Sequence, residues 1–217
     1  MVANVIGATG MVGRELVSQL LEREEIGLVR IFVRRKSGLS HPRLEEHLIN
    51  FDLPGSWSSM VTGDLLFSTL GTTLKQAGSK EAQYRVDFTY NLHFAEAAAQ
   101  NGVRKYLLVS AAGANPRSIV FYSRIKGELD EKVQKLPFQT IHILRPSILT
   151  GSREIRRPAE EWSAAVMGKV SRLIFRDYRP ISAATVARAM INAALWENRN
   201  GITVVKPGEL FNLATLK

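Results

Sequence analysis

Short runs of apolar and β-branched residues recur along the chain, and longer stretches between them repeat apolar residues every three or four positions. A run of about four to eight such residues is typical of a buried strand, whereas the wider spacing is typical of a helix with one apolar face. The first predicted strand ends at Ile6. Further strands are predicted at 28–33, 47–51, 65–69, 106–110 and 140–144, with a seventh at 203–205.

The helical spacing covers residues 11–24, 83–100 and 119–135, and it returns in two stretches near 162–173 and 186–195 before a short C-terminal helix. Apolar strands that alternate with helices specify a parallel sheet covered on both faces, with ligands at the carboxyl ends of the strands. The predicted fold class is therefore α/β, a Rossmann-type doubly wound parallel sheet. We expect a single domain over residues 1–217, in which 151–185 form a small segment that caps the substrate cleft.

Composition narrows the class of protein. A hydrophobic content of 45% and a charged content of 23% are ordinary for a globular domain, and no apolar run approaches the roughly 18 residues of a membrane helix. No basic and apolar leader precedes the first strand, so a cytoplasmic location is expected. Cysteine is absent, which excludes disulfides and thiolate sites, and we expect no metal site because the histidines lack ligand spacing. They are His41, His47, His93 and His142.

The net charge of +9 favours acidic partners, either nucleic acid or a small anionic cofactor or substrate. The basic residues are scattered, with clusters at 34–36 and 153–157, and no aromatic stacking surface accompanies them. The pattern therefore favours a small anionic ligand over nucleic acid. The arginines of the second cluster could contact an anionic substrate, but a solvated charge run is the favoured interpretation. Monomer and dimer are equally compatible with the sequence.

Glycines at 7, 10 and 13 lie between the first strand and the first helix. This spacing lets the backbone turn tightly and approach a pyrophosphate, and the helix N-terminus would direct its free N–H groups at the phosphates. An ordinary glycine loop is the alternative. The position at a strand-to-helix junction favours a nucleotide site. The predicted phosphate-binding residues are Gly7, Thr9, Gly10, Met11, Val12 and Gly13.

The second strand ends in Arg34 and Arg35, where an NAD site would place an acid for the ribose hydroxyl. Arginine instead offers a fork of donors to a 2′-phosphate, so NADP(H) is the predicted cofactor, although a solvated basic loop has the same composition. After the third strand, Asp52 and Leu53 are predicted to hold the adenine edge or to form a simple turn. After the fourth strand, small residues would let the cofactor lie close to the backbone at Leu70, Gly71 and Thr72.

The fifth strand delivers Ser110, and Tyr122 and Lys126 follow on one face of the next predicted helix. An unperturbed tyrosine titrates near ~10, and a neighbouring ammonium would lower that pKa toward the range useful for proton transfer. Lys126 could also hold the ribose, and Ser110 could donate to the substrate oxygen. The alternative is that Tyr122 packs at a helix edge and Lys126 is solvated.

Together these segments resemble the short-chain dehydrogenase/reductase superfamily in its atypical branch, and they are most similar to the NmrA-like oxidoreductases related to the human Tat-interacting protein. The matching pieces are VIGATGMVGRELV, the basic end of the second strand, STLGTTLKQAGS, VDFTYNLHFAEAAAQNGVRKYLLVSAAGA, FYSRIKGELDEKV and ILRPSILTG. The resemblance implies that Ser110, Tyr122 and Lys126 are catalytic and that Pro146 lies near the nicotinamide.

Two motifs depart from the typical enzymes of this superfamily. The glycine spacing is Gly-x-x-Gly-x-x-Gly, and STLGTT replaces their Asn-Asn-Ala-Gly, so the asparagine of their proton relay is not carried over. The resemblance implies an NADP(H)-dependent oxidoreductase that transfers hydride between the nicotinamide and a carbonyl or alcohol of a small molecule. The alternative function is an NADPH-sensing regulatory protein without turnover.

Overall fold

A parallel sheet forms the centre of the molecule. The computed structural model describes residues 1–150, 179–195 and 200–216, and within them seven parallel strands follow the order β3-β2-β1-β4-β5-β6-β9. The strands are β1 (Val2–Ile6), β2 (Leu28–Val33), β3 (Leu44–Leu48), β4 (Leu65–Ser68), β5 (Lys105–Val109), β6 (Thr140–Leu144) and β9 (Gly201–Val205). The order reverses between β1 and β4, which confirms the predicted Rossmann-type fold. In open parallel sheets of this kind, ligands bind outside the carboxyl ends of the strands at such a reversal.

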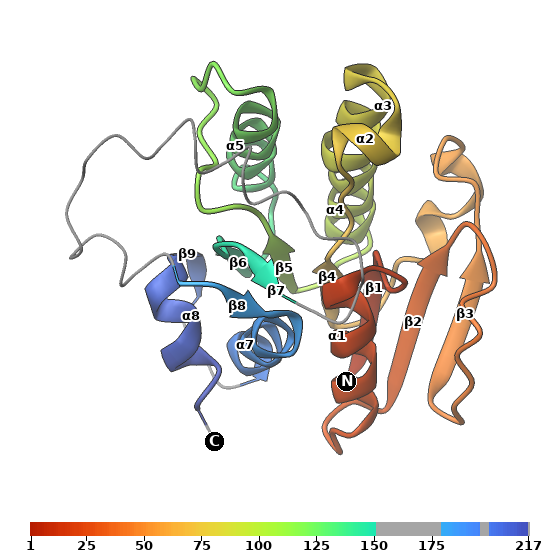
Figure 1. Cartoon of the computed structure of the whole chain (residues 1–217). Coiled ribbons are helices and arrows are strands. Elements are labelled where there is room, and N and C mark those ends of the chain that lie inside the picture. The colour runs from red at the N-terminus through yellow and green to blue at the C-terminus, as the bar shows by residue number, and fades with distance from the viewer. Residues whose placement is uncertain (151–178, 196–199, 217) are drawn as a thin grey trace.

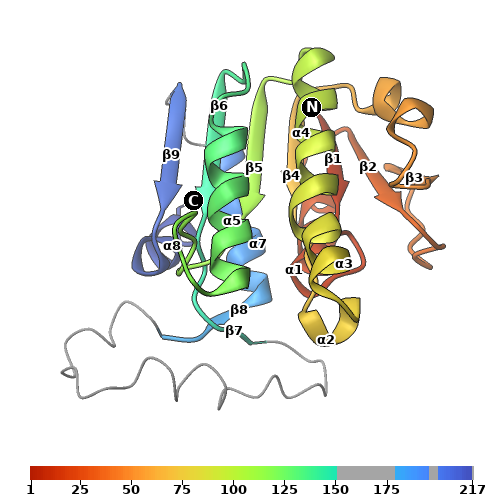
Figure 2. The same ribbon diagram turned by 90° about the horizontal axis from the view of Figure 1, so that it is seen from above.

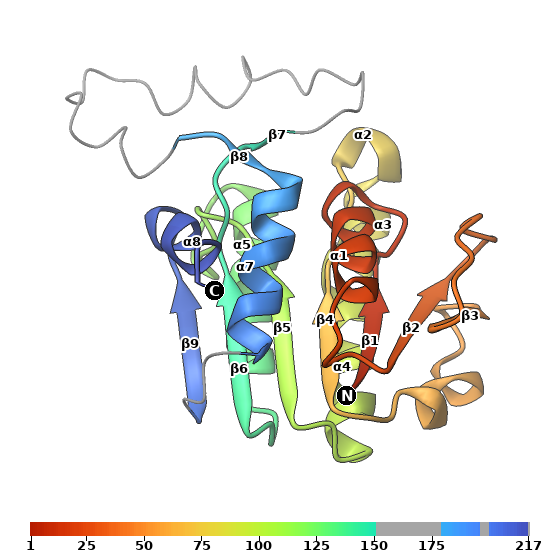
Figure 3. The ribbon, with the colours of Figure 1, turned by 90° about the horizontal axis from the view of Figure 1, so that it is seen from below.

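Helices cover both faces of this sheet (Figure 1). One layer contains α1 (Met11–Leu21) and α7 (Ala183–Leu195), which lie in front of the strands in Figure 3. The opposite layer contains α4 (Tyr90–Gln100) and α5 (Phe121–Val133), which lie in front in Figure 2. The shorter helices are α2 (Leu74–Ala77), α3 (Lys80–Tyr84), the π-helical turn η3 (Arg85–Thr89), α8 (Pro207–Leu213) and the 3₁₀ turns η1 (Pro54–Ser56) and η2 (Ser58–Met60).

Each strand contributes to two separate cores because successive side chains point to opposite faces. Val5 and Leu107 pack with α1 and α7, whereas their neighbours Ile6 and Leu108 pack with α4 and α5. Burial on both faces explains why the central strands are continuous apolar runs and why the sequence located them to within about one residue.

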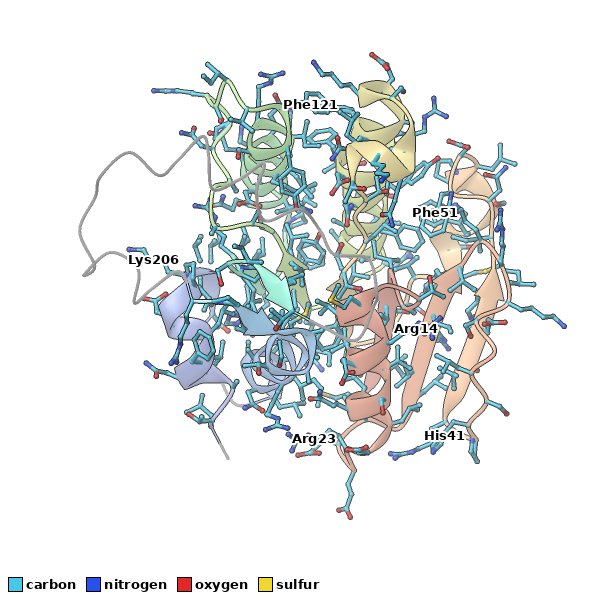
Figure 4. All side chains as sticks on the ribbon, viewed as in Figure 1. Arg14, Arg23, His41, Phe51, Phe121 and Lys206 are labelled. Carbon is cyan, nitrogen blue, oxygen red and sulfur yellow. The ribbon has the colours of Figure 1, made fainter. Side chains whose placement is uncertain are left out.

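The third strand lies three residues earlier than expected. The predicted range 47–51 is wrong, because β3 is the amphipathic segment Leu44–Leu48, paired in parallel with β2. As the edge strand it is buried on neither face, so its sequence carries acids and no long apolar run. Phe51, which suggested the later range, is instead buried in the turn that follows, beside β2 and β3 (Figure 4).

The helix predicted over 83–100 starts earlier and is composite. It begins at Lys80, and η3 interrupts it before α4. Beyond the carboxyl end of β6, β7 (Leu149–Thr150) pairs with β8 (Ile181–Ser182). Most of the predicted cap over 151–185, including the arginines at 153, 156 and 157, lies outside the described residues. Among the described helices, none is long and apolar enough to cross a membrane.

Candidate functional site

The glycine loop after β1 forms a tight turn against the end of β4. Gly7 has φ +80°, and the Gly10 N–H donates to its carbonyl oxygen at 2.8 Å. A Cβ at Gly7 would lie 2.5 Å from the backbone of Thr69 and Leu70. A Cβ on Gly13 would lie 2.1 Å from the Gly7 carbonyl oxygen. Both positions therefore require glycine, the first for its φ and the second because α1 packs directly on the turn.

Helix α1 begins at the carboxyl edge of the sheet, one residue after Gly10. The first N–H groups of a helix have no acceptor within the helix. In α1 these groups belong to Met11 and Val12, and the first turn of the helix contains no acidic residue. The Arg14 side chain donates from Nε to the Thr9 carbonyl oxygen at 3.1 Å and lies on the side of α1 that faces β2 (Figure 4). The loop thus presents N–H donors and a guanidinium, which suits a pyrophosphate.

The loop after β4 is held by two buried polar residues of the composite helix. Asp87 accepts a 3.0 Å hydrogen bond from the Thr72 N–H through Oδ2. Asn91 donates to the Leu70 carbonyl oxygen at 3.3 Å and also hydrogen-bonds the Ser68 hydroxyl. These bonds fix the small-residue loop that was predicted to lie under the cofactor.

The predicted ribose and adenine contacts lie at the same edge of the sheet. Arg34 and Arg35 directly follow β2 and are exposed. Asp52 and Leu53 are exposed in the turn after β3, and Asp52 accepts a 2.8 Å hydrogen bond from the Tyr90 hydroxyl through Oδ1. This bond connects the turn to α4, and the contact of Asp52 with the adenine edge stays a prediction.

Ser110, Tyr122 and Lys126 come together at the carboxyl end of β5. Ser110 immediately follows the strand, and its N–H donates to the Leu144 carbonyl oxygen at 2.8 Å. Tyr122 and Lys126 occupy the first two turns of α5, and the Lys126 Nζ donates to the Val109 carbonyl oxygen at 3.3 Å. Pro146 is buried beside them, and its carbonyl oxygen accepts the Ala112 N–H at 3.0 Å.

Lys126 is buried rather than solvated, which removes one alternative from the sequence analysis. Its side chain is 3% exposed, and its Nζ lies 3.4 Å from Oδ1 of Asp87, which is 1% exposed. Burial is the largest single influence and disfavours the charged form, but the charge and hydrogen bonding of Asp87, together with the charges of two further groups, outweigh it and raise the pKa of Lys126 above its usual value. Tyr122 and Asp130 act in the same direction. Lys126 is therefore an ammonium at neutral pH.

A second buried charge pair lies one helical turn further along α5. The Asp130 side chain is 1% exposed. Its Oδ2 accepts a 3.0 Å hydrogen bond from the Arg145 Nε and lies 2.9 Å from Nη2 of the same guanidinium. Burial raises the pKa of Asp130, while hydrogen bonding from Ser110 and the charges of Arg145 and Lys126 oppose that rise. Negative and positive groups thus alternate beside the candidate site, in the order Asp87, Lys126, Asp130 and Arg145.

We expect Arg145→Met to destabilise the protein by about 2 kcal/mol at pH 7, because it leaves the Asp130 carboxylate buried without its cation. This loss of unfolding free energy is smaller than expected for a fully buried ion pair, because the Arg145 side chain is 28% exposed to solvent. The folded-state pKa of Asp130 is already raised, so the ionised form opposes folding. The loss of unfolding free energy in the variant should therefore be largest at a pH above the pKa of Asp130 in the folded variant. It should shrink as the pH falls through that pKa and Asp130 becomes protonated. Urea unfolding at several pH values measures this dependence. A loss that does not change with pH would contradict this account.

A cleft of about 590 Å³ lies outside this cluster, between α3, α5 and the turn after β3. Lys80 and Arg124 stand over the Phe121 ring on its rim, 5.7 and 5.6 Å from the ring centroid. Among the predicted site residues, Asp52 lines this cleft. The three residues predicted to be catalytic, which we call the trio, do not line it; they are Ser110, Tyr122 and Lys126. No group of three or more potential metal ligands occurs in the described part of the chain.

Four residues that the structure places in or beside this site were not predicted from the sequence: Arg14, Asp87, Asn91 and Asp130. Arg14 could have been found, since it follows the glycine motif directly. The Asp87 and Asn91 pair is spaced i, i+4 on a predicted helix, and Asp130 follows Lys126 by the same spacing. Polar residues at such positions are ordinary on an exposed helix face, so spacing alone did not mark them as buried.

Known proteins resemble this chain in sequence. The family model described as NAD(P)H-binding matches residues 7–195. The protein fmp52, mitochondrial, of Aspergillus fumigatus is 37% identical over 205 residues, which cover 89% of this chain and 87% of the relative. The FMP52 protein of Eremothecium gossypii, also named mitochondrial, is 32% identical over 219 residues, or 97% and 96% of the two chains.

Solved structures share the fold at low sequence identity. A UDP-glucose 4-epimerase from Thermotoga maritima superposes with a TM-score of 0.68 at 15% identity, covering 99% of this chain and 81% of that one. A short-chain dehydrogenase/reductase superfamily protein from Agrobacterium tumefaciens, with bound NAD, gives a TM-score of 0.69 at 16% identity and the same coverages. These matches agree with the Rossmann-type sheet described above.

The cytoplasmic location expected from the sequence is wrong. The curated relatives, which match nearly the whole chain, are named mitochondrial. The expectation rested on the lack of a recognisable leader, and such a lack does not determine a compartment.

Proposed function

The chain belongs to the NAD(P)H-binding family, and from this premise we propose that it is an NADP(H)-dependent oxidoreductase of the atypical short-chain dehydrogenase/reductase type. Its substrate would be a small molecule with a carbonyl or alcohol group. The observation that carries the proposal is the buried, charged Lys126, held beside Ser110 and in the electrostatic field of Tyr122 at the sheet edge where the glycine loop lies. We also propose that the protein is mitochondrial, as its relatives are named.

The residues present fit a dinucleotide. The glycines at 7, 10 and 13 add no side chains to the turn before α1, and a Cβ at Gly7 or Gly13 would collide with backbone. The N–H groups that open α1 would hold the pyrophosphate, Asp52 the adenine edge, and Lys126 the ribose hydroxyls. The loop Leu70–Thr72, tied down by Asp87 and Asn91, would support the middle of the cofactor.

The side chains of the trio would supply acid–base chemistry. When bound, the cofactor supplies or accepts the hydride. The Tyr122 phenol would give its proton to the substrate oxygen during reduction and take it back during oxidation. The Lys126 ammonium would stabilise the phenolate, and Ser110 would donate a hydrogen bond to the same oxygen as charge develops there.

We expect Arg34→Ala/Arg35→Ala to weaken NADPH binding by about tenfold or more and to leave NADH binding within about twofold. The physical reason is that charge-assisted bonds to the 2′-phosphate, each contributing about 1.5–3 kcal/mol, would be lost only for NADPH. Isothermal titration and thermal shift with both cofactors provide the measurement. Lys132→Ala/Arg188→Ala removes the same charge from exposed positions on α5 and α7 and should leave both affinities unchanged.

Tighter binding of NADH than NADPH by the unmodified protein would overturn the NADP(H) assignment. Turnover is tested separately, by following NADPH oxidation with a panel of aldehydes, ketones and quinones. NADPH binding without oxidation by any of them would favour the sensing function over the enzymatic one.

A further inference from the structure

Asp87 and Lys126 form an ion pair that is almost completely removed from solvent. The two side chains are 1% and 3% exposed, and their charged atoms lie 3.4 Å apart. A buried ion pair often contributes no more stability than well-packed apolar residues, because both charges lose their hydration. Sequence motifs assign a role to Lys126 but none to Asp87, so the function of the acid in this pair has to come from the structure.

The backbone around Asp87 is unusual as well. Asp87 is the central residue of the π-helical turn η3, which joins α3 to α4. Such turns are rare and frequently occur at functional sites, because the extra residue redirects a side chain. The two oxygens of the Asp87 carboxylate contact different parts of the fold. Oδ2 accepts a 3.0 Å hydrogen bond from the Thr72 N–H in the loop after β4, and Oδ1 faces the Lys126 ammonium on α5.

The loop after β4 is shaped to approach this carboxylate. A Cβ on Gly71 would lie 3.0 Å from Oδ1 of Asp87 and 4.0 Å from the Lys126 Nζ. A side chain at Gly71 would therefore press on the pair. Asp87 thus connects the loop predicted to support the cofactor with the lysine predicted to hold its ribose.

We propose that Asp87 is a positioning residue for the reaction proposed above: its carboxylate holds the Lys126 ammonium, charged and fixed against the Val109 carbonyl oxygen, beside Tyr122 and the Thr72 loop. The inference rests on the proposed function, because the purpose of the ammonium is to bind the ribose and stabilise the phenolate. Asp87 acts through Lys126 and does not itself touch the reacting atoms.

The electrostatics explain why Lys126 needs this partner. Burial works against its charge, and the groups that support it are Asp87 from η3, Tyr122 and Asp130 from α5. Asp130 is already engaged by Arg145, which follows β6, so its field is largely offset. Without the charge of Asp87, burial would dominate and lower the pKa of Lys126. A neutral amine would hold the ribose less tightly and would no longer favour the phenolate.

Asp87→Asn tests the inference, because the amide keeps the shape and an acceptor for Thr72 but removes the charge. NADPH affinity and kcat are measured from about pH 6 to about pH 9.5, below the usual lysine pKa. We expect the variant to remain within about threefold of wild type at the acidic end. At the alkaline end we expect it to lose about tenfold in both quantities, since each unit of pH above a lowered pKa removes tenfold of the ammonium form.

Two further variants isolate the cause. Glu128→Gln removes an acid two residues from Lys126 on α5, where Glu128 lies 3.9 Å from Arg124 near the surface, and should leave the pH profiles unchanged. Asp87→Asn/Lys126→Arg restores a permanent charge, because a guanidinium does not titrate in this range. The double variant should therefore show no alkaline loss of NADPH affinity beyond that of Lys126→Arg alone.

A loss in Asp87→Asn that is equal at every pH, or no loss at all, would overturn the positioning role and leave Asp87 a structural residue. The NADPH titration separates this failure from failure of the proposed function. If no substrate of the panel is turned over, the oxidoreductase proposal fails, whereas the pH dependence of NADPH affinity still decides the role of Asp87. Absence of NADPH binding in the unmodified protein would overturn both.

Discussion

Tyr122→Phe should lower kcat by about 10³-fold while leaving NADPH affinity within about threefold of wild type, because a positioned general acid contributes about 10²–10⁴-fold. The variant keeps the ring and removes only the hydroxyl proton that would pass to the substrate oxygen. The Lys126 ammonium, Ser110 and the glycine loop stay in place, so cofactor binding should persist. Stopped-flow or steady-state NADPH oxidation with the best carbonyl substrate measures the change.

Tyr84→Phe is the matched control for this prediction. Tyr84 lies on α3, and burial raises the pKa of its phenol, with the nearby Glu128 acting in the same direction. The Tyr84→Phe variant also loses a phenolic hydroxyl, but at a position outside the trio. Its kcat should therefore stay within about twofold of wild type. Full turnover by Tyr122→Phe would show that the proton comes from another group and would remove Tyr122 from the mechanism.

Gly13→Ala should destabilise the protein by about 3 kcal/mol and weaken NADPH binding by about a hundredfold. An alanine within a helix ordinarily stabilises it by about 1 kcal/mol relative to glycine, so the sign here is decided by packing. The new Cβ would lie 2.1 Å from the Gly7 carbonyl oxygen and 2.9 Å from the Ala8 Cα, and backbone atoms cannot rotate away. Relief requires α1 to move off the turn, which both strains the fold and displaces the N–H groups of the helix.

Urea unfolding gives the stability change, and thermal shift or titration with NADPH gives the binding change. Gly55→Ala serves as the control, since a Cβ there meets no atom within 4 Å and the backbone has no positive φ. It should be neutral in both measurements. A Gly13→Ala protein as stable as wild type would mean that α1 does not pack on the turn as described.

Much of the proposed site could be located in the sequence because its signals are local. Gly7 and Gly13 sit within one strand-to-helix junction, and Tyr122 and Lys126 are one helical turn apart. Apolar runs buried on both faces located β2 and β6 with their observed bounds. Where a strand lies at the edge, as β3 does, that signal disappears and the prediction was displaced toward Phe51.

The buried charges could not be predicted in the same way. Whether Asp87 is solvated or buried depends on how α5 and the Gly71 loop pack against η3, and these elements come together only in the folded chain. The same holds for Asp130, whose cation Arg145 arrives from the end of β6. Hydrophobic periodicity predicts which face of a helix is apolar. It does not predict that a polar residue is buried through an ion pair with a residue on another element.

The sequence by itself therefore determined the alternation of strands and helices, the glycine turn and the positions of Ser110, Tyr122 and Lys126, because each depends on neighbours a few residues away. The tertiary structure alone decided that Lys126 is buried in an ion pair with Asp87 and that the buried Asp130 is paired with Arg145. Desolvation and charge pairing depend on everything that surrounds a side chain, and for these residues the surroundings come from segments that are distant in sequence.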